Sequence, residues 1–210
     1  MLPSRVGFWK EIVSGYTPET ALEVGCNWGR NLEDLEALGV SCVGVDVNAD
    51  AIKMANEKGF NVWYGDSTQL DFSPNSYELV FCSGLFIHLN TPELLLTMRE
   101  MARVASRYVL FSEYCTKEEQ EVPYRGFRGA LFKRDFHRIF EITTGTSERG
   151  RGELGKDTGF DDTTWGIYDT RDYPSTAAEY KAAEQGFGGR EREATDIARS
   201  GEGYRIWSGG

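Results

Sequence analysis

Acidic side chains stand at or beside the ends of three strand-like runs in the first part of the sequence. Glu23 lies just inside the end of the first run, Asp46 ends the second, and Asp66 follows the third. The first run continues into a turn that contains Gly25 and Gly29. Glycine lets the backbone approach a ligand closely because no Cβ intervenes, and a carboxylate at a strand end can accept from ribose hydroxyls. The pattern predicts a pocket for a nucleoside-bearing cofactor.

The residues of the turn favour S-adenosylmethionine over a dinucleotide. A dinucleotide-binding turn has the pattern G-x-G-x-x-G, in which the second glycine lets the backbone contact a pyrophosphate. Here Asn27 takes the place of that glycine, and a bulky Trp28 follows it. Asparagine tolerates a left-handed backbone, so the turn can form, but these side chains suit a pyrophosphate poorly. An NAD-dependent sugar oxidoreductase is therefore the weaker alternative.

Each polar group of the predicted pocket has an expected partner in S-adenosylmethionine. Glu23 is an acceptor suited to the ammonium group or to a bridging water molecule. Asp46 can accept both ribose hydroxyls, a role that NAD enzymes share. Asp66 can accept from the adenine amino group. The predicted cofactor-binding residues are Glu23, Gly25, Asn27, Gly29, Asp46, Asp66, Ser67 and Ser83.

Strand-like and helix-like segments alternate from residue 8 to about residue 140. Helices are expected at 8–15, 30–38, 49–58, 91–105 and 131–140, and strands at 22–24, 41–45, 61–64, 77–82 and 108–111. Asn48 is the expected cap of the third helix, and Thr91 that of the fourth. Residues 142–144 and 164–168 are expected to form a terminal antiparallel pair, joined by a glycine- and charge-rich loop at 148–159. The pattern predicts an α/β, Rossmann-like doubly wound fold, whose mainly parallel seven-stranded sheet has a terminal antiparallel strand.

Composition narrows the class of protein further. The 210 residues suffice for one domain, expected at 1–170, and 171–210 form a glycine- and charge-rich tail that we expect to be flexible. The net charge of −10 disfavours nucleic acid and anionic membranes as partners. The four cysteines are widely spaced, so we expect no metal site and no disulfide framework. With no signal-peptide core and no long apolar run, we expect a soluble cytoplasmic protein.

The three acidic positions and the glycine turn together resemble the class I S-adenosylmethionine-dependent methyltransferases. Their pattern of E/D-x-G-x-x-x-G matches Glu23, Gly25 and Gly29, and their acids after the second and third strands match Asp46 and Asp66. The resemblance implies that the chain is a methyltransferase with S-adenosylmethionine as its cofactor.

Downstream segments are similar to one subgroup, the pseudaminic acid biosynthesis-associated methylases. The most specific block is E-V-P-Y-R-G at 121–126 followed by L-F-K-R-D-F at 131–136, and the resemblance covers residues 5–169. It implies that the acceptor is a nonulosonic (pseudaminic-type) sugar or its activated precursor. Members of the subgroup usually begin with an additional segment ahead of the first helix, and this chain starts too late to contain it. The tail after about residue 170 has no counterpart in the subgroup. These two differences motivate the second hypothesis, a non-catalytic adenosylmethionine-binding partner in glycan assembly.

Two residues are candidates for the chemistry of methyl transfer. His88 follows the fourth strand, near the expected position of the methyl group, and histidine is suited to proton transfer near neutral pH. The alternative is a histidine bonded to the backbone at a loop–helix junction. Glu113, at the end of the fifth strand, is a second candidate base or a contact for a sugar hydroxyl, and the alternative is an acid that caps a loop.

Basic residues after the fifth strand are the candidate acceptor contacts in this acidic chain. Arginine recognises carboxylate and phosphate groups through two parallel hydrogen bonds, and nonulosonic acids carry a carboxylate. The alternative is a set of surface ion pairs with nearby acids, namely Glu118, Glu119, Glu121 and Asp135. The predicted substrate-binding residues are Tyr114, Tyr124, Arg125, Lys133 and Arg134.

Overall fold

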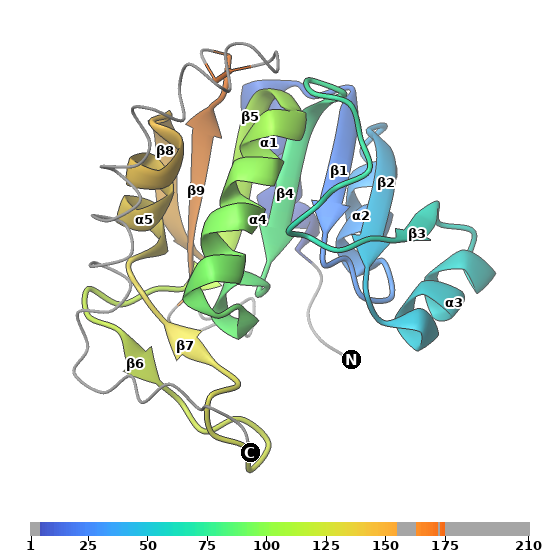
Figure 1. Ribbon diagram of the computed structural model, residues 1–210. Helices are drawn as coiled ribbons and strands as arrows, with labels where there is room; N and C mark the ends of the chain where they lie inside the picture. Colours follow the sequence, from blue (N-terminus) through green and yellow to red (C-terminus); the bar gives the residue numbers. More distant parts are fainter. Residues whose placement is uncertain (1–4, 155–162, 172, 175–210) are drawn as a thin grey trace.

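Seven strands form one sheet, and apolar runs make up its central strands. The computed structural model of the protein describes residues 5–154, 163–171, 173 and 174. The strand order is β3-β2-β1-β4-β5-β9-β8, and within the described part of this sheet only β9 runs against its neighbours (Figure 1). The predicted doubly wound fold with its antiparallel last strand is confirmed. The strands are β1 (Thr20–Val24), β2 (Ser41–Asp46), β3 (Val62–Tyr64), β4 (Tyr77–Ser83), β5 (Ala105–Tyr114), β8 (Ser147–Leu154) and β9 (Thr163–Asp169).

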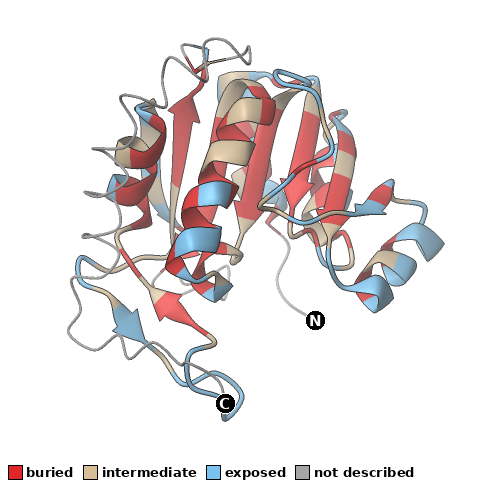
Figure 2. Ribbon diagram, viewed as in Figure 1, coloured by how far each residue is buried: buried red, intermediate tan, exposed pale blue. Residues whose placement is uncertain are grey.

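Helices cover both faces of the sheet, and each face has its own hydrophobic core. The helices α1 (Val6–Tyr16), α2 (Arg30–Glu36) and α3 (Ala49–Glu57) pack on one face. The helices α4 (Thr91–Val104) and α5 (Phe136–Thr144) pack on the other. Figure 2 shows that the central strands are buried along most of their length, while α3 is mostly exposed. The parallel strands therefore present their carboxyl ends from a rigid, doubly covered sheet.

Side-chain caps fix where two of the helices begin. Asn48 accepts hydrogen bonds from the N–H groups of Asp50 and Ala51, which confirms it as the cap of α3. The cap of α4 is Asn90, one residue before the predicted Thr91. Asn90 and Glu93 form a reciprocal capping box, which satisfies two backbone N–H groups at once.

Between β5 and α5 the structure differs from the prediction. Residues 131–135 were expected to be helical, but Phe132–Lys133 form strand β7, which pairs with β6 (Gln120–Glu121). Helix α5 begins only at Phe136, because the Asp135 side chain caps it by accepting from the N–H of Arg138. A local apolar pattern at 131–140 cannot distinguish these two elements, since the strand depends on pairing with distant residues.

The last antiparallel pair also differs from the prediction. Residues 142–144 belong to the end of α5, and the partner of β9 is β8, which lies in the stretch predicted to be a loop. The glycines of that stretch make room for aromatic rings. A Cβ at Gly150 would lie 2.7 Å from the hydroxyl of Tyr16, and one at Gly152 would lie 2.6 Å from the indole nitrogen of Trp165. The glycines therefore permit close packing within the strand.

A hairpin formed by β6 and β7 extends beyond the edge of the sheet where the parallel strands end (Figure 1). At its tip Tyr124 and Phe127 exchange two backbone hydrogen bonds of 2.9 Å. The two residues between them, Arg125 and Gly126, have φ angles of +50° and +86°. This is a two-residue turn with both central residues left-handed, which suits the twist of paired strands. Arg125 therefore occupies the tip of the hairpin.

The connection from β3 to β4 has no helix in residues 65–76, all of which are described. It crosses the α4 face of the sheet as an extended segment (Figure 1). We refer to residues 65–76 as the crossover segment.

Other expectations concern features beyond the sheet. The predicted tail lies outside the described residues except for Arg171, Tyr173 and Pro174, and a weak helix expected at 177–185 lies outside them entirely. All four cysteines are free thiols, and the described residues contain no group of three or more potential metal ligands. In the same part of the chain, no helix has the length and apolar character needed to cross a membrane.

Candidate functional site

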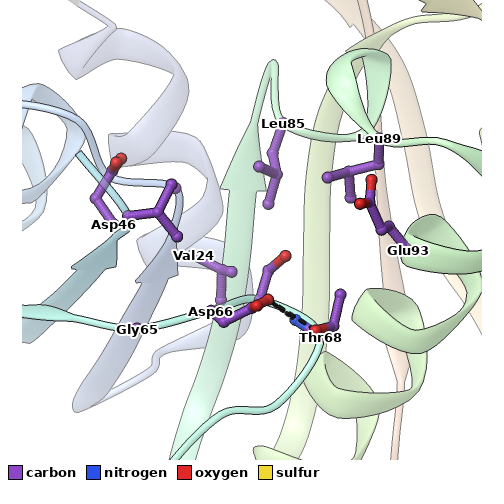
Figure 3. A pocket seen from close by; sticks show the side chains of 11 residues that line it. Val24, Asp46, Gly65, Asp66, Thr68, Leu85, Leu89 and Glu93 are labelled. Atoms are coloured by element: carbon purple, nitrogen blue, oxygen red, sulfur yellow. Dashed lines mark hydrogen bonds between the residues drawn. The ribbon is translucent and has the colours of Figure 1, made fainter. Parts of the chain in front are cut away.

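A cavity of about 300 Å³ opens at the carboxyl ends of the parallel strands. Its wall comes from β1, from the ends of β2 and β3, and from the segment that leads into α4 (Figure 3). Four of the predicted cofactor residues line it, and these are Gly25, Asp46, Asp66 and Ser67. The other lining residues are Val24, Val47, Gly65, Thr68, Leu85, Leu89 and Glu93.

The glycine turn adopts the left-handed conformations that its sequence predicts. The φ angles of Gly25, Asn27 and Gly29 are +74°, +50° and +82°. A Cβ at Gly25 would lie 3.1 Å from a methyl carbon of Leu85, and one at Gly29 would lie 2.7 Å from the ring of Phe60. The glycines therefore serve both the turn and the close packing around it. Asn27 and Gly29 belong to this turn but do not line the cavity.

Asp46 ties the glycine turn to the end of β2. Its Oδ2 accepts from the N–H of Asn27 at 2.8 Å, and its Oδ1 accepts from the N–H of Asn48 at 2.8 Å. A carboxylate has about four acceptor sites, so these two bonds leave capacity for hydroxyl donors. The residue is thus held in place and can still accept from a ligand.

Asp66 also lines the cavity, beside Thr68 in Figure 3. Its Oδ1 accepts from the N–H of Thr68 at 2.8 Å and from the Thr68 hydroxyl at 2.7 Å. These hydrogen bonds lower the pKa of the Asp66 carboxyl, because they favour its charged form. Both bonds end on Oδ1, so Oδ2 is available to a ligand donor. The hydroxyl of neighbouring Ser67 instead pairs with that of Thr97 at 2.8 Å.

Glu23 is buried, with 1% of its surface exposed. Its Oε1 accepts from the side-chain amide of Asn31 at 2.6 Å, and its Oε2 has no hydrogen-bond partner among the described residues. Burial raises the pKa of the Glu23 carboxyl to about 8. A buried acceptor without a partner carries a free-energy cost that a donor from a ligand would remove.

Arg5 is a site residue that the sequence analysis missed. Its guanidinium donates to Ser83 Oγ at 2.5 Å and lies close enough to Glu23 for the two charges to interact. Burial lowers the pKa of Arg5, which is 5% exposed. Arg5 thus links Glu23 of β1 to Ser83 of β4. No motif surrounds Arg5 in the sequence, so only its place just before α1 could have drawn attention to it.

These residues fit the polar groups of S-adenosylmethionine. The unpartnered Oε2 of Glu23 and the buried guanidinium of Arg5 complement an ammonium and a carboxylate on one amino acid moiety. Asp46 and Asp66 offer acceptors for ribose hydroxyls and for an amino group. Apolar side chains line the cavity between them, as a purine ring requires; these are Val47, Leu85 and Leu89.

Glu113 caps the turn that follows β4. Its Oε1 accepts from the N–H groups of Leu85 and Phe86 at 2.8 and 2.9 Å, where the short helix η1 (Phe86–His88) begins. Burial raises the pKa of its carboxyl to about 7, against the opposing effect of these N–H donors. Its Oε2 is buried without a hydrogen-bond partner among the described residues. The role as a base stays a prediction, and it would act through this oxygen.

His88 ends η1, one residue before Leu89 of the cavity wall. Its Nδ1 lies 2.9 Å from the carbonyl oxygen of Ala130, and its ring lies 5.2 Å from that of Tyr124. A carbonyl can only accept, so Nδ1 carries the proton and Nε2 of the neutral ring carries the lone pair. The backbone bond expected under the alternative hypothesis is present. The same bond also fixes the orientation of the ring, which a general base requires. The hypothesis of a base and that of a backbone-bonded histidine therefore both stay open.

The predicted acceptor residues fall into two groups. Tyr124 and Arg125 lie at the hairpin tip, where the guanidinium is 5.2 Å from the tyrosine ring. Lys133 lies near Tyr114, with its ammonium 5.6 Å from that ring. All four side chains are at least partly exposed, so a ligand can reach them. These residues stay predictions for acceptor binding.

Arg134 occupies a buried position that does not favour acceptor binding. Only 1% of its surface is exposed, and its guanidinium donates to Glu119 at 2.7 Å and to the carbonyl of Leu89 at 2.9 Å. The ion pair of the alternative hypothesis therefore forms, although it is buried rather than at the surface. Arg134 attaches the hairpin to the end of η1, and we do not include it among the proposed acceptor contacts.

Comparison with known proteins identifies the domain type of the cofactor-binding region. Residues 21–107 match the family model described as a methyltransferase domain. Curated relatives are ubiquinone biosynthesis O-methyltransferases. The protein of Nitrosomonas europaea is 31% identical over 97 residues, which are 43% of this chain and 41% of the relative. That of Klebsiella pneumoniae is 28% identical over 98 residues, covering 43% and 40%. The chain thus spans about two fifths of the length of these relatives.

Solved structures share the fold at low sequence identity. A protein of Pyrococcus horikoshii matches with a TM-score of 0.64 and 17% identity, over 79% of this chain and 89% of that chain. The magnesium protoporphyrin IX methyltransferase of Synechocystis, solved with S-adenosylmethionine bound, matches with a TM-score of 0.59 and 18% identity, over 79% of each chain. The narrower resemblance to the pseudaminic acid subgroup stays a prediction.

Proposed function

We propose that this chain, whose residues 21–107 form a class I S-adenosylmethionine-dependent methyltransferase domain, transfers a methyl group to a small acidic acceptor. The observation that carries the proposal is the cavity at the strand ends. Asp46 and Asp66 both line it, and all of its lining residues fall within the matched range. The chain spans only part of its relatives, so the activity of the whole protein rests on this proposal.

Bound S-adenosylmethionine supplies a methyl group on a positively charged sulfur. In the proposed complex, Glu23 accepts from the ammonium group and Arg5 donates to the carboxylate. Asp46 accepts from the ribose hydroxyls and Asp66 from the adenine amino group. Holding two reactants in one orientation supplies a large part of the rate enhancement of a displacement reaction.

His88 is the proposed base for a hydroxyl acceptor. The bond from Nδ1 to the Ala130 carbonyl leaves the lone pair on Nε2. Nε2 would take the hydroxyl proton as the methyl carbon's bond to sulfur breaks and its bond to oxygen forms, with S-adenosylhomocysteine as the leaving group. Glu113 holds the N–H groups at the start of η1 and so positions the helix that ends in His88. The names of the curated relatives favour oxygen as the methylated atom.

Acceptor binding is proposed for Tyr114, Tyr124, Arg125 and Lys133. We call these residues, together with η1 and the β6–β7 hairpin, the acceptor half of the site. Their two positive charges suit a carboxylate or a phosphate in an otherwise acidic chain. The resemblance of residues 121–136 to the pseudaminic acid subgroup supports a nonulosonic sugar or its nucleotide-activated precursor as the acceptor.

A methyl-transfer assay tests the proposal. The protein is incubated with S-adenosylmethionine and a nonulosonic acid, its nucleotide-activated form, or a neutral sugar of similar size, and products are identified by mass spectrometry. We expect methylated product from an acidic sugar only. In Arg125→Ala we expect kcat/KM to fall about 10- to 100-fold, as for a lost charged hydrogen bond, with unchanged affinity for S-adenosylhomocysteine.

Other outcomes of this assay select other functions. Equal activity of Arg125→Ala removes the proposed acceptor contact. Binding of S-adenosylhomocysteine without turnover of any of these sugars supports the second hypothesis, a non-catalytic binding partner. A reaction that depends on NAD would support an oxidoreductase instead.

A further inference from the structure

An ion pair on α4 holds the crossover segment through its backbone. Arg103 donates to the carbonyl oxygens of Leu70 and Phe72 at 2.9 and 2.7 Å. Glu100 accepts from the N–H of Leu70 at 2.8 Å. The two side chains also bind each other through two hydrogen bonds of 2.6 and 2.7 Å. We refer to Glu100 and Arg103 as the α4 clamp.

The α4 clamp supplies hydrogen-bond partners for backbone groups of the crossover segment. Backbone N–H and C=O groups removed from water need partners, and a helix provides them internally. The crossover segment has no helix, so charged side chains provide them instead, and bonds of this kind are stronger than neutral ones. Both clamp side chains are less than one fifth exposed, at 18% for Glu100 and 17% for Arg103, so the pair is partly shielded from water.

The part of the crossover segment that α4 holds begins next to Asp66, the proposed contact for the adenine amino group. Ser67 and Thr68 line the cavity with Asp66, and the hydroxyl of Ser67 is bound to Thr97 on the same helix. The Asp66 carboxylate is fixed by its own local turn to Thr68. On one side of this turn, the N–H of Gly65 donates to the carbonyl oxygen of Asp46 at 3.1 Å and joins it to the sheet. On the other side, contacts with α4 hold Ser67 and Leu70, so α4 sets where this end of the turn lies.

We propose that Glu100 and Arg103 are positioning residues for recognition of the adenine base. They touch no ligand, and they act by holding the crossover segment so that Asp66 faces the cavity. The inference rests on the proposed function, because it takes Asp66 as the acceptor of the adenine amino group. It predicts that the α4 clamp governs base selectivity, beyond any contribution to stability.

Two measurements on the full chain separate these effects. Calorimetry compares the affinities for S-adenosylhomocysteine and S-inosylhomocysteine. In the second ligand a carbonyl replaces the amino group from which Asp66 would accept a hydrogen bond. A carboxylate facing a carbonyl has no donor, so we expect the native protein to prefer the adenosyl ligand about 10- to 100-fold. Amide hydrogen exchange of residues 66–72 without ligand reports directly how firmly the segment is held.

In Arg103→Met we expect faster exchange across residues 66–72 and a ligand preference reduced to about threefold or less, as for loss of one positioned hydrogen bond. Glu100→Gln is a milder second variant, since its amide oxygen can still accept from the N–H of Leu70. Arg107→Met is the matched control. It removes a partly exposed pair with Glu78 (3.6 Å) outside the segment and should leave both measurements unchanged.

The outcomes distinguish failure of this inference from failure of the proposed function. Unchanged exchange and unchanged ligand preference in Arg103→Met would overturn the positioning role. Equal weakening of both ligands, with the preference kept, would show a merely structural role and would also overturn it. If the native protein binds neither ligand, the proposed function fails. The exchange data then still decide whether the α4 clamp holds the segment.

Discussion

The cofactor half of the site, around the ends of β1 to β3, and the acceptor half position their polar groups in different ways. In the cofactor half, backbone N–H groups hold Asp46 and Asp66. Those of Asn48 and Thr68 are two residues away, and that of Asn27 is 19 residues away. In the acceptor half, side chains hold segments that are distant in sequence. Glu113 holds η1, and Arg134 joins the hairpin to Leu89. Contacts two residues apart in the sequence thus hold part of the Asp46 and Asp66 turns, whereas these acceptor-half contacts join residues 28 and 45 positions apart.

The largest expected effect is a loss of turnover in the acceptor half without loss of cofactor binding. His88→Asn keeps a side-chain donor for the Ala130 carbonyl but removes the Nε2 lone pair. We expect kcat to fall about 10²- to 10⁴-fold, the usual contribution of a general base. Affinity for S-adenosylhomocysteine and the melting temperature should not change. A variant with full activity would show that the bond to Ala130 is the whole role of His88.

The next effect concerns the cofactor half alone. Asp46→Ala removes the acceptor of two backbone N–H groups and of the proposed ribose contact. We expect affinity for S-adenosylhomocysteine, measured by calorimetry, to fall about 100-fold or more, because several hydrogen bonds to a charged group are lost. Asp50→Ala, in the first turn of α3, is the control. Retained micromolar binding in Asp46→Ala would mean that the cavity takes a different ligand.

A third prediction tests the sheet that supports the acceptor half. A Cβ at Gly152 would lie 2.6 Å from the indole nitrogen of Trp165. We expect Gly152→Ala to lower the free energy of unfolding by about 1–3 kcal/mol, the usual cost of overpacking. Gly7→Ala in α1, where no atom lies within 4 Å of the new Cβ, is the control and should be neutral or stabilising. Urea denaturation measures both, and an equally stable Gly152→Ala would contradict the packing argument.

The smallest effect is a pH dependence that arises from Glu23. Its pKa in the folded protein is about 8, above the ordinary value of 4.5, so the folded state holds a proton that the unfolded state has lost. The resulting stability is fully present below pH 4.5 and is lost as the pH rises through 8. Between pH 6.5 and 8, Glu23 should lower the free energy of unfolding by about 1 kcal/mol per pH unit. Glu23→Gln should reduce this slope, to which Glu113 also contributes because its pKa is raised to about 7, whereas exposed Glu57→Gln should leave the slope unchanged. Equal slopes in all three proteins would contradict the raised pKa.

The distance in sequence between contacting residues also explains what the sequence alone could predict. The glycine turn, the acid at the end of β2 and the helix cap Asn48 are recognised from residues close to them in the sequence. Short motifs therefore sufficed to predict where they lie in the fold. Strand β8 was missed because Gly150 and Gly152 indicate a turn unless the rings of Tyr16 and Trp165 are known to lie beside them. Arg5 and the buried state of Arg134 were missed because their partners, Ser83 and Glu119, are set by tertiary structure.

The β6–β7 hairpin lies between the last parallel strand and α5, outside the sheet, and no residue of it lines the cavity. Its length and tip residues can therefore change in evolution without altering the strands that carry the cofactor contacts. The hairpin is accordingly the part of this molecule where a change of acceptor could arise by exchange of a short stretch of sequence. Related chains that methylate different compounds should diverge most within it.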